Sequence, residues 1–267
     1  MDTYEHIAIH AQNGVLYIKF NRPSVGNALS LAMVEELADI ISKSENDDSI
    51  RVLVFSGEGK HFCAGGDIKD MAQARRAKQE GGDPIALLNR AFGTIITRVQ
   101  NFPKPVVMVV SGAAMGGGFG LVCVGDVIIA DSTAKFRLPE TGLGLPPAQI
   151  APFLVSRLGL SKARRLALTG ASLTAQEALE IGLVDFCVEP EEMESLLAKQ
   201  LQAILCCAPK ASACTKQILL AVGSTPHETL LDEAAASFAD CARGAEGMEG
   251  MMSFIQKRKP SWAQEPS

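Results

Sequence analysis

The sequence has no excess of positive charge. Its 25 lysines and arginines are outnumbered by 30 aspartates and glutamates, which gives a formal net charge of −5. A protein that binds nucleic acid needs a basic face to neutralise phosphates, so nucleic acid is not expected as a partner. Lys257-Arg258-Lys259 and Arg164-Arg165 could form local basic patches, but such clusters are as often simply solvated on helices.

Patterns typical of metal sites and disulfide frameworks are also missing. Seven cysteines occur without a C-x-x-C pair, and four histidines occur without an H-x-x-x-H or H-E-x-x-H pattern. A metal is therefore not expected, and the cysteines are expected to be reduced thiols of a cytoplasmic protein. The first ten residues, MDTYEHIAIH, are charged and hold no apolar core, which argues against an ordinary secretory signal.

One apolar stretch is long enough to raise the question of a membrane span. Residues 105–125 run for 21 positions without a charge, about the length of a helix that crosses a bilayer. The stretch holds six glycines and begins with a β-branched run. This composition predicts a strand, a glycine loop and a short helix instead, so no membrane partner is expected.

Short β-branched runs alternate with helical patterns in the first part of the chain. Hydrophobic residues make up 47% of the sequence, which is enough for a packed core. Residues 71–83 are polar and contain a Gly-Gly pair, so a mobile loop or an irregular helix is expected there. The alternation indicates an α/β fold with mostly parallel strands. Strands are expected at 15–20, 51–55, 106–110 and 127–130, and helices at 30–42, from about 67, and at 84–100.

The composition changes after Ser161, where long stretches rich in Ala, Leu, Glu, Lys and Gln begin. One further strand is expected at 183–188, followed by helices from about 200 to 258. We therefore divide the chain into an α/β core at 1–198 and a helical region at 199–267. Helices with wide apolar faces at a chain end pack onto their own core or onto another subunit, and the sequence does not separate these outcomes.

Two glycine-bearing loops each follow a predicted strand and open a helix, at Cys63–Asp67 and Met115–Gly118. Backbone N–H groups at such helix starts have no intrahelical partner. Two loops together could bind an oxygen that gains negative charge, as in an oxyanion hole. Phosphate or dinucleotide binding is the rival, but neither G-x-G-x-x-G nor G-x-x-x-x-G-K-[ST] is present. A tight crossing of helix and strand is an equally common reason for such glycines.

Glu140 is the candidate for proton transfer. It stands alone among apolar, glycine and proline neighbours in FRLPETGLGLPP, just after a predicted strand. Desolvation there would raise its pKa toward neutrality, as a general acid/base requires. The plainer interpretation is a surface residue or a helix cap.

Four motifs occur together and in order: N-R-P-x-x-x-N-A-L at 21–29, F-C-A-G-G-D-I-K at 62–69, the Gly-Gly-Gly loop, and A-K-F-x-x-P-E at 134–140. On these motifs the chain resembles the enoyl-CoA hydratase/isomerase, or crotonase, family over essentially its whole length. The resemblance implies a spiral of repeated β-β-α units with a helical C-terminal trimerisation region, and a homotrimer or dimer of trimers. It also implies an acyl-CoA substrate and no separate cofactor, since coenzyme A is part of the substrate.

The resemblance assigns roles to particular residues. The backbone N–H groups of Ala64 and Gly117 would bind the thioester oxygen, and Glu140 would carry the proton. Phe254 and Lys257 would reach the CoA of a neighbouring subunit, where a cation suits the phosphates. The residues assigned to the binding of substrate and CoA are Ser24, Val25, Ala64, Gly66, Asp67, Ile68, Gly117, Gly120, Phe254 and Lys257.

Gly120 departs from the family pattern. Well-studied hydratases hold water between two glutamates, in G-G-G-C-E and in P-E, and here Glu140 fills the second position while Gly120 stands at the first. A second carboxylate would repel the carboxylate of a glutaconyl substrate in a low-dielectric pocket. We therefore expect glycine at 120 to make room for a branched or charged acyl tail.

One glutamate suits more than one reaction. The stretch PETGLGLPPAQIAPF is similar to bacterial hydratases of isohexenylglutaconyl-CoA and 3-methylglutaconyl-CoA, which serve acyclic terpene and leucine breakdown. Hydration of a 3-branched glutaconyl-CoA is therefore the first expectation. Isomerisation of a 3-enoyl-CoA, with the same glutamate moving a proton between C4 and C2, is the alternative. A catalytically weak RNA-binding or assembly protein is an alternative of another class, which the acidic charge and the retained Ala64, Gly117 and Glu140 disfavour.

Overall fold

A six-stranded, largely parallel sheet forms the core of the protein. The computed structural model describes residues 3–77 and 82–263, and its main sheet has the strand order β1-β2-β3-β4-β6-β9. β1 and β2 pair antiparallel, and the other neighbours pair parallel. These strands are β1 (Ile7–Gln12), β2 (Val15–Phe20), β3 (Val52–Gly57), β4 (Val106–Val110), β6 (Val127–Asp131) and β9 (Phe186–Val188).

A second, three-stranded sheet brings two functional segments together. It consists of β5 (Ala113–Met115), β7 (Lys135–Arg137) and β8 (Ser172–Thr174), with β5 and β7 parallel. The short helix α4 (Gly117–Cys123) follows β5, and the 3-10 turn η2 (Glu140–Leu143) follows β7. Because parallel strands end at the same edge of a sheet, the glycine loop and Glu140 lie side by side.

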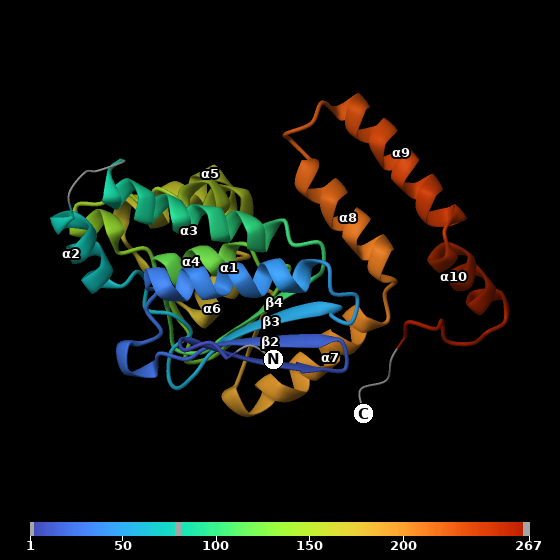
Figure 1. The fold of residues 1–267 in the computed structure, drawn as a ribbon, viewed down its shortest axis with the longest axis horizontal. Helices are drawn as coiled ribbons and strands as arrows, with labels where there is room; N and C mark the ends of the chain where they lie inside the picture. The colour runs from blue at the N-terminus through green and yellow to red at the C-terminus, as the bar shows by residue number, and fades with distance from the viewer. Residues whose placement is uncertain (1–2, 78–81, 264–267) are drawn as a thin grey trace.

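Helices cover both faces of the main sheet (Figure 1). α1 (Leu31–Glu45), α3 (Pro84–Gln100) and α4 lie on one face, and α7 (Met193–Leu205) lies on the other. The residues Val52 to Phe55 of β3 are all buried, because alternate side chains enter the cores on opposite faces. This explains why the strand reads as a continuous apolar run.

Side-chain caps start three helices where the sequence places them. Ser30 accepts a hydrogen bond from Met33 N–H (3.2 Å) at the start of α1. Asp67 caps α2 (Ile68–Arg76) through Lys69 N–H (2.9 Å). Asp83 caps α3, with proline at its first position, where the missing N–H costs nothing.

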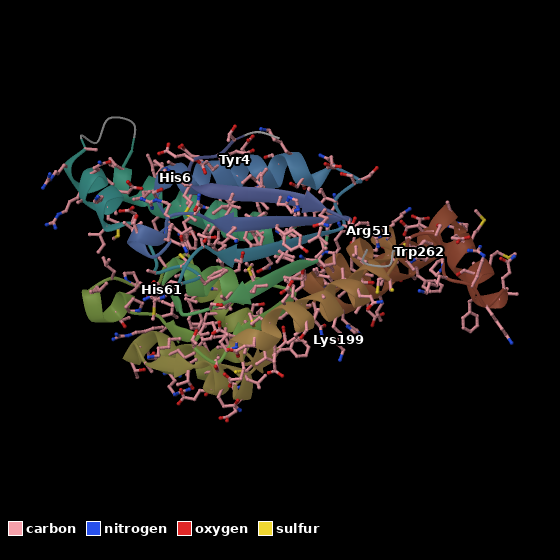
Figure 2. All side chains as sticks on the ribbon, turned by 90° about the horizontal axis from the view of Figure 1, so that it is seen from below. Tyr4, His6, Arg51, His61, Lys199 and Trp262 are labelled. Carbon is pink, nitrogen blue, oxygen red and sulfur yellow. The ribbon has the colours of Figure 1, made fainter. Side chains whose placement is uncertain are left out.

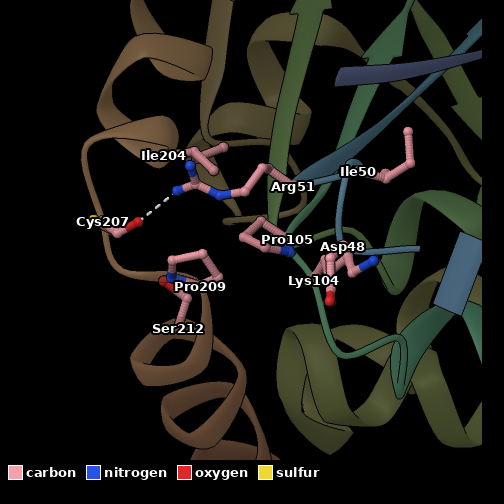
Figure 3. Close-up of a pocket in the computed structure, with 9 residues that line it drawn as sticks. All are labelled: Asp48, Ile50, Arg51, Lys104, Pro105, Ile204, Cys207, Pro209 and Ser212. Carbon is pink, nitrogen blue, oxygen red and sulfur yellow. Dashed lines mark hydrogen bonds between the residues drawn. The ribbon is translucent and has the colours of Figure 1, made fainter. Parts of the chain in front are cut away.

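The C-terminal helices form an arm that extends from the core (Figure 1). The arm consists of α8 (Pro209–Ala221), α9 (His227–Arg243) and α10 (Ala245–Ile255). Arg51 holds its base by donating to Leu205 O (3.1 Å) and to Cys207 O (2.7 Å), as Figure 3 shows for Cys207. Arg51 also donates to Trp262 O (3.0 Å), and Figure 2 labels both residues at the junction of core and arm.

An ion pair also joins the arm to the core, between Lys216 Nζ on α8 and Asp126 Oδ2 (2.6 Å). The division predicted at 198/199 falls within α7, whose Leu201 is buried against the main sheet. The arm carries large exposed apolar side chains, among them Phe238 and Phe254, at 76% and 84% exposed. One chain alone therefore leaves an apolar face of the arm uncovered.

The helices and most strands agree with the predictions. The strands β2, β3, β4, β6 and β9 and the helices α1, α2 and α3 are confirmed, with ends shifted by a few residues. β1, β5, β7 and β8 were not predicted, and β8 corrects the expectation of a single strand after Ser161. Two further helices, α5 (Ala151–Thr169) and α6 (Ala175–Glu180), follow η2 along the chain and stand before and after β8.

Two ambiguous stretches are resolved in part. In the segment 71–83, α2 is a regular helix up to Arg76, while residues 78–81 lie outside the described residues. The uncharged stretch 105–125 divides into β4, β5 and α4. Within residues 3–77 and 82–263, no helix has the length and apolarity that a bilayer crossing requires.

Candidate active site

The loop at residues 63–67 and the glycine loop at 116–118 lie against each other. Cys63 N–H donates to Ala113 O (2.9 Å), and Cys63 O accepts from Met115 N–H (2.9 Å). Gly118 approaches Cys63 so closely that an added Cβ would lie 2.6 Å from the Cys63 carbonyl oxygen. For Gly118, therefore, a tight crossing is the reason for glycine.

Gly116 brings the start of α4 next to Glu140. Its φ of 49° and ψ of −117° are a conformation that side chains rarely adopt. A Cβ added there would lie 2.9 Å from Glu140 Oε1 and 3.6 Å from Gly65 Cα. The two loops and the carboxyl group of Glu140 therefore meet at one point.

Glu140 carries a buried oxygen atom that has no partner. Its Oε2 is buried and makes no hydrogen bond within the described part of the protein. Burial raises the pKa of this carboxyl group above its ordinary value of 4.5, and a hydrogen bond with its own backbone offsets only part of this. An acid with a raised pKa and a free oxygen can exchange protons with a substrate near neutral pH.

Ala64 does not offer its N–H group to a ligand. That N–H donates to Gly26 O (2.8 Å), and a backbone N–H has one hydrogen, so the prediction of Ala64 as an oxyanion donor is wrong. Among the described residues, no protein acceptor receives the N–H of Gly66 or that of Gly117. Gly66 is exposed, and Gly117 is the first residue of α4, where donors lack intrahelical partners.

Cys63 lies where the two loops meet, but it is not a nucleophile. Burial raises the pKa of its thiol to about 12, so the reactive thiolate is absent at neutral pH. The site therefore offers backbone donors and one carboxyl group.

Protein side chains fill the space beside Gly120. A Cβ added at this position would lie 3.0 Å from Ile150 Cγ1 and 3.1 Å from Ile96 Cδ1. The prediction that glycine makes room here for a substrate tail is therefore wrong, because the two isoleucines occupy that room.

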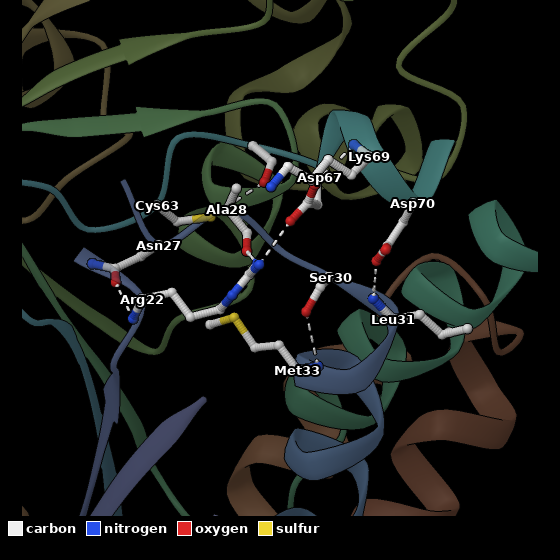
Figure 4. A network of polar contacts seen from close by, with 11 residues as sticks. Arg22, Asn27, Ala28, Ser30, Leu31, Met33, Cys63, Asp67, Lys69 and Asp70 are labelled. Atoms are coloured by element: carbon white, nitrogen blue, oxygen red, sulfur yellow. Dashed lines mark hydrogen bonds and ion pairs between the residues drawn. The ribbon is translucent and has the colours of Figure 1, made fainter. Parts of the chain in front are cut away.

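Asp67 uses its carboxylate inside the protein (Figure 4). It accepts from Arg22 Nη2 (2.8 Å) and from Lys69 N–H (2.9 Å). Burial alone would raise the pKa of Asp67, but these hydrogen bonds and the charges of Arg22 and Lys69 outweigh it and hold the pKa below its ordinary value. The carboxylate thus fixes the end of the 63–67 loop.

Three other predicted CoA-binding residues are exposed near this loop. Ser24 and Val25 form the 3-10 turn η1 (Pro23–Val25), and Ile68 at the start of α2 is 80% exposed. The turn is tied to the loop because Gly26 O accepts from Ala64 N–H. Their contact with CoA stays a prediction.

A sequence profile for enoyl-CoA hydratase/isomerase matches residues 10–265. The chain belongs to this family. The short-chain-enoyl-CoA hydratase of Clostridium acetobutylicum is 32% identical, over 95% of this chain and 96% of its own. The 2,3-dehydroadipyl-CoA hydratase of Escherichia coli is 33% identical, over 96% and 98%. The crystal structure of an enoyl-CoA hydratase/isomerase from Marinobacter aquaeolei has a TM-score of 0.94 and 52% identity, covering 97% of this chain and 99% of that one.

Phe254 and Lys257, predicted to contact the CoA of a neighbouring subunit, lie far from Glu140 in this family member. Phe254 is on α10 at the outer part of the arm, whereas α2 and α4 lie in the core (Figure 1). Lys257 follows α10 and is exposed, with a φ of 54°. One chain does not bring these residues to its own loops, so their role stays a prediction.

Sequence reasoning missed the residues that shape the site from behind. Asn27 is fully buried and donates to Glu58 O (3.0 Å) and His61 O (2.7 Å), which pins the turn at 23–27 to the segment that leads into the 63–67 loop. Its place in N-R-P-x-x-x-N was the available signal. Ile150 carried a weaker one, because it stands in the stretch PETGLGLPPAQIAPF on which the substrate prediction depends.

Proposed function

We propose that the chain adds water across the 2,3 double bond of an enoyl-CoA thioester. The N–H groups of Gly66 and Gly117 would hold the thioester oxygen, in place of the pair predicted with Ala64. Glu140 would be both the base and the acid. The unpaired buried Oε2 of Glu140, beside a glycine loop with a free donor, is the observation that carries this proposal.

One carboxyl group is enough to carry the proton through the whole reaction. Glu140 carboxylate takes a proton from water while the water oxygen bonds to C3 and the thioester oxygen becomes an enolate oxygen. The two N–H groups stabilise this charge, and the loss of one such donor typically lowers kcat by about 10²–10³. Protonated Glu140 then returns the proton to C2, which restores the carbonyl and the carboxylate.

The substrate we propose is a 3-branched glutaconyl-CoA such as isohexenylglutaconyl-CoA, an intermediate of acyclic terpene breakdown, or its leucine-pathway counterpart 3-methylglutaconyl-CoA. The similarity of residues 139–153 to hydratases of these thioesters supports the assignment. A relative named for 2,3-dehydroadipyl-CoA shows that the family includes a hydratase of a dicarboxylic thioester.

A cytoplasmic homotrimer or dimer of trimers is part of the proposal. The exposed apolar side chains of α9 and α10 support it, because large exposed apolar patches mark interaction surfaces. An assembly would also supply a neighbour whose CoA could meet Phe254 and Lys257.

Incubation in ¹⁸O-labelled water tests the reaction. Crotonyl-CoA, 3-hexenoyl-CoA and 3-methylglutaconyl-CoA are offered separately, and the products are analysed by mass spectrometry. Hydration predicts that the heavy oxygen enters the acyl product of a 2-enoyl thioester. Glu140→Gln should abolish this while CoA binding persists, and Glu191→Gln, an exposed glutamate outside the site, should not change it.

Isomerisation of a 3-enoyl-CoA is the second candidate. Ile150 and Ile96 leave no second acid beside Gly120, and moving a double bond needs only one proton carrier and no water. The same experiment separates the two, because isomerisation converts 3-hexenoyl-CoA without initial uptake of labelled oxygen. Turnover of that thioester alone would replace hydration by isomerisation.

A further inference from the structure

Ile150 and Ile96 close one side of α4 with aliphatic surface. Ile150 stands at the N-cap of α5 and is 5% exposed, and Ile96 on α3 is fully buried. A Cβ added at Gly120 would lie 3.0 Å from Ile150 Cγ1 and 3.1 Å from Ile96 Cδ1, so both side chains border this position. The surface beside this turn of α4 is therefore apolar and closed to water.

This surface lies next to the reacting carboxyl group. Gly120 N–H donates to Gly116 O (3.0 Å), so the two glycines are one helical turn apart, and Glu140 Oε1 lies beside Gly116. One turn of an α-helix rises about 5.4 Å. Glu140 and Ile150 therefore flank neighbouring turns of α4, and a substrate whose reacting carbons reach Glu140 has aliphatic side chains beside them.

Two contacts hold Ile150 in place. Its carbonyl oxygen accepts Leu154 N–H (3.0 Å) in the first turn of α5. The preceding residue, Gln149, lies on α3 so closely that a Cβ added at Gly93 would be 1.9 Å from Gln149 Oε1. The side chain of Gln149 therefore packs on α3, and Ile150 follows it directly as part of an aliphatic wall beside α4.

We propose that Ile150, backed by Ile96, is a specificity-determining residue that selects acyl-CoA substrates with an aliphatic branch at the β-carbon. The inference rests on the proposed hydration and adds an orientation to it. The aliphatic branch faces the isoleucines, and a carboxylate on the other branch points away from α4. A charge against this wall would lose its hydration without gaining a partner.

The test compares crotonyl-CoA with its branched analogue, 3-methylcrotonyl-CoA. Both are assayed by the uptake of labelled water oxygen with the wild type, Ile150→Val and Ile150→Ala, and Leu160→Ala serves as the control, since Leu160 is on the same helix but 61% exposed. The loss of one methylene contact in an apolar pocket typically lowers kcat/KM by about 10–200-fold. We expect Ile150→Ala to lower kcat/KM for the branched thioester by at least about tenfold, Ile150→Val to lower it less, and the linear thioester to change less in both.

Any other result would contradict either the role proposed for Ile150 or the proposed function. Equal losses for both thioesters in the Val and Ala variants would make Ile150 a purely structural residue. A gain for the branched thioester would mean that the wall crowds the branch rather than binding it. If Ile150→Ala melts too early to assay, the ratio in Ile150→Val decides by the same criterion. A wild type that hydrates neither of these thioesters nor 3-methylglutaconyl-CoA would overturn the proposed function itself, before any variant is compared.

Discussion

Gly118→Ala tests whether the tight crossing of the two loops sets the geometry of the site. The new Cβ would lie 2.6 Å from Cys63 O, 2.7 Å from Cys63 Cβ and 3.0 Å from Cys63 Sγ. Carbon atoms prefer separations of about 3.5–4.0 Å, so the loops must move apart by roughly 1 Å. The nearest obstacle is a backbone carbonyl, which no rotamer change can relieve.

Both stability and activity should fall. Overpacking of a tight core typically costs about 1–3 kcal/mol, which should appear as a lower melting temperature in calorimetry. Gly66 follows Cys63 by three residues and Gly117 precedes the new side chain, so the two proposed donors move relative to each other. A misplacement of about 1 Å can lower the rate about 10²-fold, and we expect a loss in kcat/KM of that order.

Gly142→Ala is the matched control. Gly142 lies in the exposed part of η2, has no atom within 4 Å of an added Cβ, and has no unusual φ. The Gly142→Ala variant should therefore have the melting temperature and the kcat/KM of the wild type. If Gly118→Ala kept its full kcat/KM while its melting temperature fell, the spacing of the two loops would not set the rate, and this reasoning would be refuted.

Three further predictions address the acid, its neighbour and the arm. Since burial raises the folded-state pKa of Glu140, its ionisation costs stability as pH rises from 4.5 through the raised value. Glu140→Gln should therefore raise the melting temperature at neutral pH but not below pH 4.5, and wild-type activity should fall as pH drops through the raised value. Gly120→Glu should unfold the chain at a lower temperature, and Ile150→Gly added to it should recover part of the loss. Lys216→Met should cost about 1.5–3 kcal/mol in chemical denaturation, because it leaves Asp126 without its cation.

The sequence predicts the parts of the fold whose patterns are local. The β-branched run of β4, and the caps Ser30 and Asp83, mark elements that form for reasons contained in a few neighbouring residues. The strands β5, β7 and β8 have three residues each, too few for a periodicity to show. They exist because they pair with each other across long separations, which no single window of sequence reveals.

The site divides in the same way. Glu140 and Gly117 carry motif and composition signals, and both lie where the two loops meet. The prediction for Ala64 was wrong because its N–H group is already bonded to Gly26 O, a partner 38 positions away that the sequence pattern does not reveal. The prediction for Gly120 was wrong because a glycine leaves room for a ligand only where no other side chain fills the space beside it. Ile150 enters it here, from a helix that follows α4 after two further strands.

Because the site has one carboxyl group, the burial of Glu140 has to set a pKa that suits two different steps. Glu140 has to be a base before the water adds and an acid afterwards, and both tasks go well only when its pKa lies near the working pH. In a site with two glutamates the tasks can be divided between groups of different pKa. Here the desolvation that raises the pKa of Glu140 has to serve both, and the aliphatic surface of Ile150 and Ile96 offers no second acid at position 120. A variant that lets water reach Glu140 should therefore weaken the removal of a proton from the attacking water, because a carboxylate whose pKa returns to its ordinary range is a weaker base.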